Sequence, residues 1–393
     1  MESRHLQTTV VTSWQAAEAL QLEWNGLFQT LAQREIFSTF GWCQAWWRTV
    51  GGQATPRIIL AREGGHLVGL GPFAIVNRRV GPLNLRALQW TGGPQGDYLD
   101  VLVNNSRPDV FQAIFQAVEE FRKDWDFMDL WHVSDRSPNW ESWRRLGQKE
   151  EEGWSRRFHA IAPFADLAGT TAQAFLAGLP KGLRYDLRRG ERELASLGEL
   201  RVIEIKPSDE EHFSRFWNFL DIREALTGRS QRRDSRVRFE AFYKNLLASP
   251  ELAGQIRFLA LCCANRSVAY HFGFQDTRKA YYYKPAFDPD LAKSSPGKVL
   301  LWKLLEDGCN RELQEFDFLL GDEAYKGNWT QGNRRVYAFT RYRPSLRGIL
   351  ARIAYGWVKP WLARNGAIPR WGKGDASRWA SGMPKVSARS GGR

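Results

Sequence analysis

The two halves of the chain show the same order of hydrophobic patterns. In the first half, apolar residues at helical spacing occupy 14–32 and 42–50, with Ser13 as a candidate N-cap. Gly64-Gly65 is typical of a two-residue hairpin turn between strands. The remaining patterns predict strands at 57–62, 66–77, 85–91, 98–103 and 127–133, and helices at 109–122 and 140–146.

The second half repeats this order at a larger scale. Its patterns predict helices at 183–197, 210–226, 237–247 and 299–310, and strands at 201–206, 256–264, 267–276, 279–287 and 315–320. The order helix–helix, three strands, helix, strand therefore occurs twice, although no sequence identity between the halves is visible. An antiparallel meander followed by a strand–helix–strand crossover is typical of a mixed α/β fold. We expect one domain over 1–165, a second over 166–342 and a tail over 343–393.

Composition excludes several classes of protein. A length of 393 residues suits two domains, and 43% apolar with 25% charged residues excludes wholesale disorder. No run of about 18 uncharged apolar residues predicts a transmembrane helix, and the N-terminus shows no secretory signal. The four cysteines and six histidines show no metal-binding spacing, so we expect no metal, and we expect a reduced cytoplasmic location.

The net charge of +13 is concentrated at the C-terminus. Residues 343–393 contain eleven Lys/Arg and one acid, Asp375, so they hold +10 and the first 342 residues hold +3. A nucleic-acid-binding domain carries its positive charge on the fold itself, so the sequence argues against nucleic acid as a partner.

The tail begins with a basic amphipathic pattern. Over 345–364, six apolar residues alternate with four Lys/Arg, interrupted by Gly356 and Pro360. Such a pattern is typical of a segment that lies on an anionic membrane, and equally of a solubilising tail packed on the body. We expect residues from about 366 onward to be unstructured, because they are rich in Gly, Ser and basic side chains.

The start of the helix near residue 299 has chemistry that suits an anion. Ser295, Pro296, Gly297 and Lys298 precede it. Pro favours a helix start, Gly lets a ligand approach the backbone, and the first N–H groups carry partial positive charge. Lys298 adds a formal cation. These residues predict either a pyrophosphate site or a plain helix start.

A second group of reactive side chains surrounds the last strand. Asp317 interrupts the apolar run 316–320, where a carboxylate needs a partner or a shifted pKa, so it is a candidate general base or a buried ion-pair partner of an Arg. Alternation along the strand points it away from Phe316 and Phe318 and toward a possible cleft. The loop that follows is either a site for acid–base chemistry or a solvated turn, and it contains Asp322, Glu323, Tyr325 and Lys326.

The chain resembles a known family of acyltransferases. The second half carries Tyr281-Tyr282-Tyr283, Ala286-Phe287-Asp288-Pro289, Ser295-Pro296-Gly297 and the stretch from Phe316 to Trp329, while the first half carries Phe37-Ser38-Thr39-Phe40-Gly41-Trp42, Leu67-Val68-Gly69 and Asp97-Tyr98-Leu99-Asp100. Over about residues 10–342 these landmarks resemble the CelD-like family of GNAT-type acyltransferases from cellulose biosynthesis. More distantly, the paired halves resemble FemAB-type peptidoglycan aminoacyltransferases, which are tandem GNAT folds.

The resemblance implies tandem GNAT-like folds and an N-acyltransferase. The donor would be acyl-CoA (acetyl-CoA or longer), with its pantetheine along strand 279–287, at Tyr283, and its pyrophosphate at residues 295–298. The resemblance also implies that the catalytic residues lie in and after the last strand, and the candidates there are Asp317, Asp322, Glu323, Tyr325 and Lys326. The acceptor would be an amine on a small molecule or glycan precursor in envelope or exopolysaccharide biosynthesis.

One departure and two alternatives accompany this resemblance. Family members often carry a His near the end of the second half's first long helix, where this chain reads Leu220-Asp221-Ile222-Arg223-Glu224. The alternatives are a FemAB-type aminoacyltransferase that uses charged tRNA, and a non-catalytic assembly or scaffold protein on the same fold.

Overall fold

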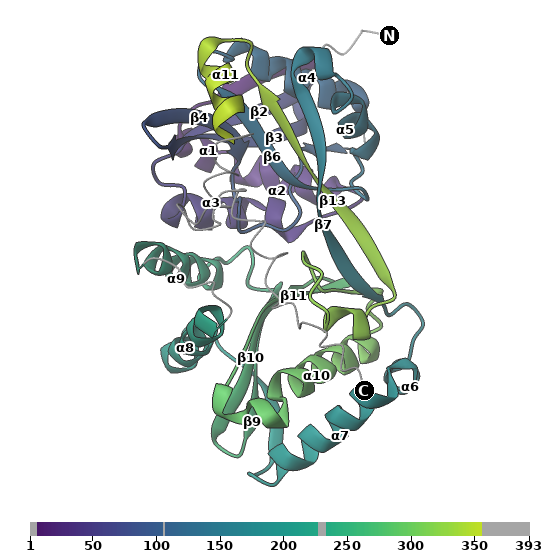
Figure 1. Ribbon diagram of the computed structural model, residues 1–393. Coiled ribbons are helices and arrows are strands. Elements are labelled where there is room, and N and C mark those ends of the chain that lie inside the picture. The colour runs from purple at the N-terminus through teal and green to yellow at the C-terminus, as the bar shows by residue number, and fades with distance from the viewer. Residues whose placement is uncertain (1–5, 105–106, 227–232, 356–393) are drawn as a thin grey trace, which may run out of the picture. The chain divides into compact units, whose positions relative to one another are not determined.

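The chain forms two compact units that are interleaved along the sequence. The structure, a computed structural model, describes residues 6–104, 107–226 and 233–355 (Figure 1). Of these described residues, contacts group 6–161, 236–254 and 334–355 into the first unit, and 162–235 and 255–333 into the second. Each unit is described by itself below. A division of the chain at residues 165 and 342 stays a prediction from the sequence.

The first unit is a mixed sheet with helices on both faces. Its strands follow the order β1-β2-β3-β4-β6-β13, and β5 pairs with β3. All pairings are antiparallel except β4 with β6, which is parallel. The strand bounds are β1 (Leu6–Val11), β2 (Thr55–Glu63), β3 (His66–Val80), β4 (Leu83–Trp90), β5 (Leu102–Val103), β6 (Phe127–Ser134) and β13 (Gly332–Tyr342).

Aromatic side chains fill the core of this unit. On one face Trp24 and Phe40 pack on Leu60 and Leu70, and on the other Phe115 and its neighbours cover the sheet. The helices are α1 (Trp14–Glu18), α2 (Gln21–Thr30), α3 (Phe40–Thr49), α4 (Pro108–Glu120), α5 (Trp140–Leu146), α9 (Arg233–Leu247) and α11 (Leu346–Ile353), with 3-10 turns η1 (Ile36–Ser38) and η3 (Glu150–Glu152).

The second unit repeats the same plan. Its strands follow the order β7-β12-β11-β10-β9-β8, antiparallel except for the parallel pair β11 and β12. β7 passes from the first unit into the second. The strands are β7 (Trp154–Asp166), β8 (Leu200–Glu204), β9 (Ile256–Cys263), β10 (Arg266–Gln275), β11 (Lys279–Phe287) and β12 (Glu315–Asp317). The predicted meander and crossover are therefore confirmed in both units.

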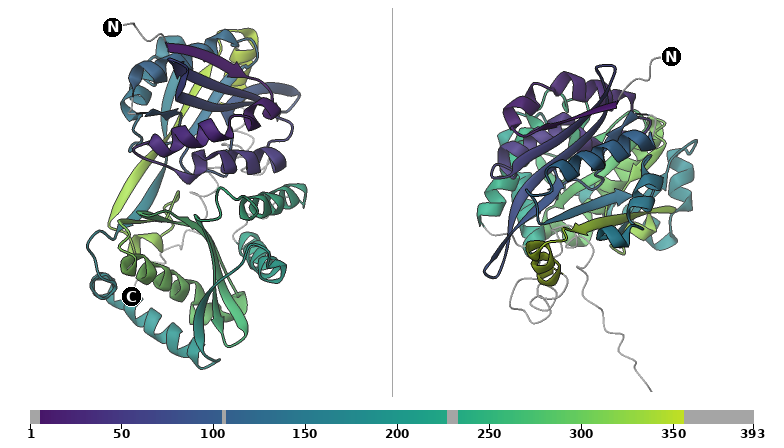
Figure 2. Two further views of the ribbon diagram at one scale, coloured as in Figure 1. Left: turned by 180° about the vertical axis from the view of Figure 1, so that it is seen from behind. Right: turned by 90° about the horizontal axis from the view of Figure 1, so that it is seen from above.

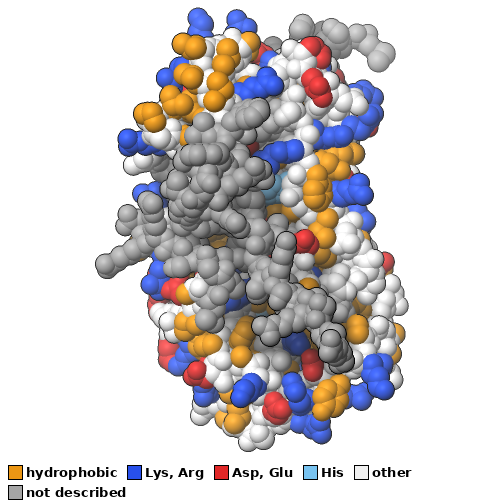
Figure 3. All heavy atoms as spheres, viewed as in Figure 1, with side chains coloured by type: hydrophobic (Ala, Val, Ile, Leu, Met, Phe, Trp, Pro, Cys, Tyr) orange, Lys and Arg blue, Asp and Glu red, His pale blue; other side chains and the backbone are white. Residues whose placement is uncertain are grey.

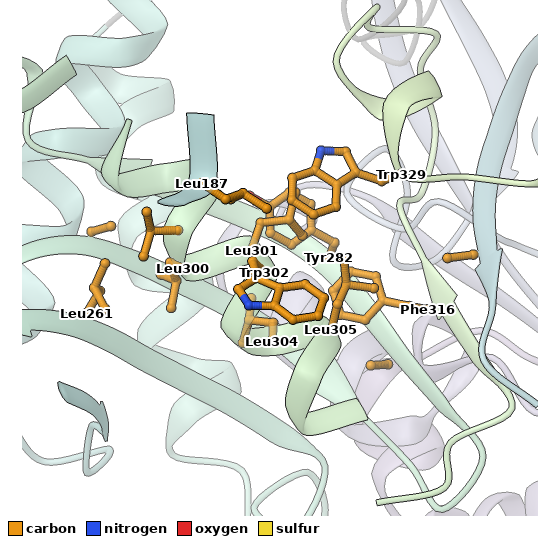
Figure 4. Close-up of a cluster of buried hydrophobic side chains, with 14 of the residues drawn as sticks. Leu187, Leu261, Tyr282, Leu300, Leu301, Trp302, Leu304, Leu305, Phe316 and Trp329 are labelled. Atoms are coloured by element: carbon orange, nitrogen blue, oxygen red, sulfur yellow. The ribbon is translucent and has the colours of Figure 1, made fainter. Parts of the chain in front are cut away.

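Helices also cover both faces of the second sheet, as the view from behind shows (Figure 2). One face carries α10 and α7, whose leucines pack with Tyr282 and Phe316 (Figure 4). On the other face, aromatic residues of α8 contact Phe258 and Phe272. The helices are α6 (Ala172–Gly178), α7 (Lys181–Ala195), α8 (Glu210–Leu226) and α10 (Pro296–Asn310), with 3-10 turns η4 (Pro289–Ser294) and η5 (Lys326–Asn328).

Several elements differ from the sequence-based predictions. The helix expected over 14–32 is two helices, because the chain turns at Ala19-Leu20. The strands β1, β7 and β13 and the helix α6 were not predicted, and the strand expected over 98–103 contains only two residues. The hairpin turn at Gly64-Gly65 is confirmed, because both glycines have positive φ.

The described part of the tail is short. α11 forms at the start of the basic amphipathic segment, whereas the remainder of 345–364 from residue 356, and the tail from 366, lie outside the described residues. None of the described helices is long and apolar enough to cross a lipid bilayer.

Candidate functional site

The parallel strands β11 and β12 separate partway along their length. β11 pairs with β10 as far as Phe287, but it pairs with β12 only over Lys279–Tyr281. β12 ends at Asp317, after which the N–H of Phe318 donates to the carbonyl oxygen of Pro163 in β7 at 2.9 Å. The edge of β11 beyond Tyr281 is therefore left without a partner strand in β12. A ligand that carries amide groups can pair with such an edge.

At the corresponding place in the first unit, the chain's own residues hydrogen-bond to the strand that would otherwise be left open. There the parallel strands pair only at Ala87–Phe127 and Leu88–Met128. Beyond this point the indole N–H of Trp90 donates to the carbonyl oxygen of Trp131 at 2.9 Å, and the N–H of Leu99 donates to that of His132 at 3.0 Å. The opening between parallel strands therefore makes the second unit the candidate site.

The helix α10 begins beside this opening. It starts at Pro296, three residues before the predicted start at 299, and it confirms the predicted helix. Ser295 has the left-handed conformation (φ 53°, ψ 48°), and its carbonyl oxygen accepts the N–H of Lys298 at 2.9 Å and of Val299 at 3.2 Å. A Cβ at Gly297 would lie 3.1 Å from the ring of Phe287, the last residue of β11. Glycine thus lets the helix start approach the strand end.

Helix α7 lies against the segment that leads into α10. The ammonium of Lys298 is 2.8 Å from a carboxylate oxygen of Asp186, and both side chains are partly exposed. This hydrogen bond lowers the pKa of Asp186. A guanidinium nitrogen of Arg189 is 3.4 Å from the carbonyl oxygen of Lys293. Lys298 therefore shares its charge with a carboxylate that the sequence reasoning missed.

The three tyrosines of β11 all lie in the interior. Tyr281, Tyr282 and Tyr283 are buried, and burial raises the pKa of Tyr282 well above its usual range. The ammonium of Lys284, also buried, lies 4.8 Å from the ring centroid of Tyr283. Any contact of Tyr283 with a donor therefore falls to its backbone in the open part of the strand.

Asp317 organises the turn after β12. It is fully buried instead of facing a cleft, and one carboxylate oxygen accepts the N–H of Leu319 at 2.8 Å. Its other oxygen is 3.8 Å from the ammonium of Lys279. Leu319 has positive φ (59°), a conformation that needs such local support.

Lys326 closes the loop that follows. Its ammonium donates to the carbonyl oxygens of Leu319, Leu320 and Gly321 at 3.3, 2.9 and 3.4 Å. It also forms an ion pair with Glu323 at 2.9 Å, and both side chains are largely buried. A buried ammonium with these acceptors holds the loop in one conformation.

The other two candidate residues of the loop reach its surface. Asp322 is exposed, and Tyr325 is half-buried against the core that contains Tyr282. The structure therefore brings the five candidate residues into one loop but gives them different environments. Asp317 and Lys326 are buried, Glu323 and Tyr325 are half-buried, and Asp322 is exposed.

Two further polar side chains reach β11 and were missed. A guanidinium nitrogen of Arg223, near the end of α8, is 2.6 Å from the carbonyl oxygen of Pro285. It stands in the region where the resembling family often carries a His. His271 of β10 is buried and stacks on Tyr282 with ring centroids 4.9 Å apart. In the sequence, Arg223 is marked only by its position near the end of a helix, and His271 only by its position within an apolar strand.

No group of three metal-ligating side chains occurs within the described parts of the chain. The four cysteines are free and buried, and burial raises the pKa of the Cys43, Cys263 and Cys309 thiols. A thiol with a raised pKa is a poor nucleophile.

Comparisons with known proteins support the same region. Residues 181–327 match the family model described as Acetyltransferase (GNAT) domain. No curated protein matches the chain significantly.

Solved structures resemble nearly the whole chain. A crystal structure of FemX has a TM-score of 0.57 at 12% identity, over 84% of this chain and 96% of that one. The C-terminal domain (DUF2156) of a putative lysylphosphatidylglycerol synthetase from Agrobacterium fabrum has a TM-score of 0.53 at 12% identity, over 86% and 96%. A conserved protein of unknown function from Bacteroides thetaiotaomicron has a TM-score of 0.53 at 10% identity, over 86% of this chain and 100% of that one. The fold is therefore mixed α/β and tandem GNAT-like, as the resemblance implied.

Proposed function

We propose that this chain, an N-acyltransferase whose residues 181–327 match a GNAT acetyltransferase domain, takes its acyl group from acyl-CoA (acetyl-CoA or longer). The acceptor is an amine on a small molecule or glycan precursor in envelope or exopolysaccharide biosynthesis, as the CelD-like resemblance implies. The observation that carries the proposal is the separation of β11 from β12 beside the start of α10.

The donor binds along the opening. Its pantetheine amides pair with the backbone of β11 around Tyr283, short of Pro285, which has no N–H and whose carbonyl oxygen already accepts from Arg223. Its pyrophosphate meets the first turn of α10 at residues 295–298. Pro296 has no N–H, and the N–H groups of Lys298 and Val299 donate to the carbonyl oxygen of Ser295. The anion therefore meets the N–H of Gly297 and the partial positive charge of the helix N-terminus. Lys298 turns from Asp186 toward the pyrophosphate, or shares its charge between the two, at little cost because the pair is partly exposed.

The reaction needs three proton and charge adjustments. The acceptor amine loses a proton, the thioester carbonyl is polarised, and the departing thiolate of CoA gains a proton. We assign the proton transfers to Asp322, whose side chain is exposed, and Tyr325, whose side chain is half-buried, because a substrate can reach both. Asp317, Glu323 and Lys326 act by holding this loop in position.

Isothermal titration with acetyl-CoA and a longer acyl-CoA tests the donor site. Gly297→Val should weaken binding, because its side chain crowds Phe287 and the ligand. Lys298→Ala should raise the Kd about ten- to a hundredfold, the loss of one charge-assisted hydrogen bond. The matched control is Lys303→Ala, a lysine on the same helix that is also ion-paired but lies beyond the first turn. Equal binding by all four proteins, or none by the wild type, would contradict the assignment.

A second candidate is aminoacyl transfer from charged tRNA. It is favoured by the fold likeness to FemX, because FemAB-type enzymes use this donor, and disfavoured by the small charge of the first 342 residues. Titration with an aminoacyl-tRNA beside the acyl-CoAs separates the two. Binding of neither donor would favour the scaffold alternative.

We also place the protein in the cytoplasm, with peripheral contact to the inner face of a membrane through residues 345–364.

A further inference from the structure

Helix α11 presents three large aliphatic side chains to solvent. The exposed fractions are 74% for Leu346, 55% for Ile349 and 47% for Ile353. Their spacing of three and four residues places them on one face of the helix. Contiguous exposed apolar side chains mark an interaction surface more often than isolated ones do.

The exposure is not caused by a loosely attached helix. The opposite face buries Ala351 and Ala354 against a cluster that contains Val80, Leu85 and Phe127. Ser345 caps the helix by accepting the N–H of Gly348 at 3.2 Å. The aliphatic face is therefore held outward by a defined attachment on the other side.

A buried carboxylate fixes the helix further. The guanidinium of Arg347 donates to both oxygens of Asp126, at 3.1 and 3.2 Å, and Arg86 donates to the same carboxylate at 3.0 Å. Burial alone would raise the pKa of Asp126, but these two arginines outweigh it and lower the pKa to about 2. Two positive charges share one negative charge here, so the attachment itself leaves an excess of +1.

Further arginines around α11 are bound to neutral groups. Arg343 donates to the carbonyl oxygen of Arg122 and the hydroxyl of Ser345, and Arg79 donates to the carbonyl oxygen of Gly81. Arg352 is exposed on the helix. Basic and hydrophobic side chains consequently lie side by side over the region where Figure 1 labels α11 (Figure 3). The chain after Tyr355 adds eight Lys/Arg and one acid, or +7.

We propose that the outward face of α11 docks on an anionic lipid surface, with Leu346, Ile349 and Ile353 entering the headgroup boundary. Aliphatic side chains flanked by arginines fit a surface that is apolar beneath and negative outside. The positive charge favours an anionic membrane over a second copy of the chain, because a second copy would bring like charges together. The inference specifies the membrane contact of the proposed function and does not depend on its chemistry.

Vesicle flotation of the full-length protein tests this docking. The probe is a vesicle of phosphatidylcholine with about 30% phosphatidylglycerol, beside pure phosphatidylcholine. Wild type should bind the anionic vesicles and dissociate at high salt, because screening weakens the arginine contribution. The triple variant Leu346→Ser, Ile349→Ser, Ile353→Ser should lower the partition coefficient by about tenfold or more.

A matched control removes the same kind of side chain elsewhere. Leu22, Val202 and Val237 are large exposed aliphatic residues outside α11, and their combined replacement by Ser should leave vesicle binding unchanged. Circular dichroism should show both triple variants to be folded, since all six side chains are largely exposed.

The proposal is overturned if wild type does not bind anionic vesicles, or if both triple variants lose binding equally. It is also overturned if the α11 variant converts a dimer to a monomer without changing vesicle binding, since a second copy would then cover the face. These measurements contain no acyl donor or acceptor. A failure to bind vesicles therefore does not contradict the proposed reaction, and a failure of the reaction does not contradict vesicle binding.

Discussion

His271 is an ionisable side chain enclosed in the second unit. Within the described residues, neither ring nitrogen has a hydrogen-bond partner at normal geometry. A Cβ at Gly273 would lie only 2.1 Å from the ring, so glycine makes room for it. Burial, together with the positive charge of Arg257, lowers the pKa of His271 to about 3. The imidazole is therefore neutral in the folded protein at any ordinary pH.

This neutral state predicts an acid-sensitive stability. Below about pH 6.5 the unfolded chain takes up a proton on His271 that the folded chain does not, so the free energy of unfolding falls until about pH 3. His271→Phe removes the titrating group and keeps the ring stacked on Tyr282. Between pH 6.5 and 4, urea denaturation should show that this variant loses roughly 3 kcal/mol less than wild type. His66→Gln, at an exposed position, is the control. Parallel pH profiles for all three proteins would rule the idea out.

At this scale the sequence predicted which residues gather but not what each one does. The start of α10 at Pro296 followed from local chemistry alone. The partner of Lys298 is Asp186, 112 residues earlier, and no local pattern connects them. The sequence marks Asp317 as unusual in an apolar strand. Only the fold shows that its carboxylate accepts a hydrogen bond from the N–H of Leu319.

Helix α7 is shaped to fit the segment before α10. A Cβ at Gly190 would lie 2.6 Å from the carbonyl oxygen of Ser294 and 3.1 Å from the side chain of Val299. Gly182, on the same helix, has nothing within 4 Å of that position. The helix therefore offers a crowded glycine and an open one for direct comparison.

Gly190→Ala should push α7 away from Ser294 and Val299, in and just after the segment that leads into α10. We expect a loss of about 1–3 kcal/mol in the free energy of unfolding, as for other overpacked sites, with weaker binding of acetyl-CoA in titration. Gly182→Ala should be neutral or stabilising by less than about 1 kcal/mol, because alanine favours helix. If the two variants unfold and bind alike, α7 does not support the loop in the way described.

Two of the strands that sequence patterns missed, β7 and β13, share a physical cause. β13 begins Gly332-Asn333-Arg334-Arg335, and the first half of β7 is mostly exposed and includes Arg156 and Arg157, so neither reads as an apolar strand. Both gain their strand conformation from pairing partners far away in the sequence. The strand expected over 315–320 ends at Asp317, because the chain leaves β12 there through the positive φ of Leu319.

At the scale of the whole molecule, the first unit depends on distant parts of the chain. β13 pairs with β6 through residues such as Val336 and Phe339, both fully buried. Phe242 of α9 stacks edge-on against Trp42 of α3, with ring centroids 5.1 Å apart. Neither segment is present in residues 1–165.

A fragment of residues 1–165 should therefore fail to fold cooperatively. Without β13, the buried strand β6 becomes an exposed apolar edge that favours aggregation. We expect no sigmoidal thermal transition by circular dichroism, and recovery of one when residues 166–355 are co-expressed. A fragment that melts as sharply as the intact protein would show that the late segments add little to the first unit.

The position of β13 also sets an order of events during protein synthesis. The ribosome makes β1 to β7 first, then the strands of the second unit, and only then β13, which lies between β6 and β7 in the sheet. Domains usually fold in the order in which they emerge. Here the half that is made first is completed last, and the edge of β6 that pairs with β13 stays open throughout translation of the second unit. An open strand edge favours pairing with other chains, so the nascent chain is most exposed to aggregation until residue 342 has emerged.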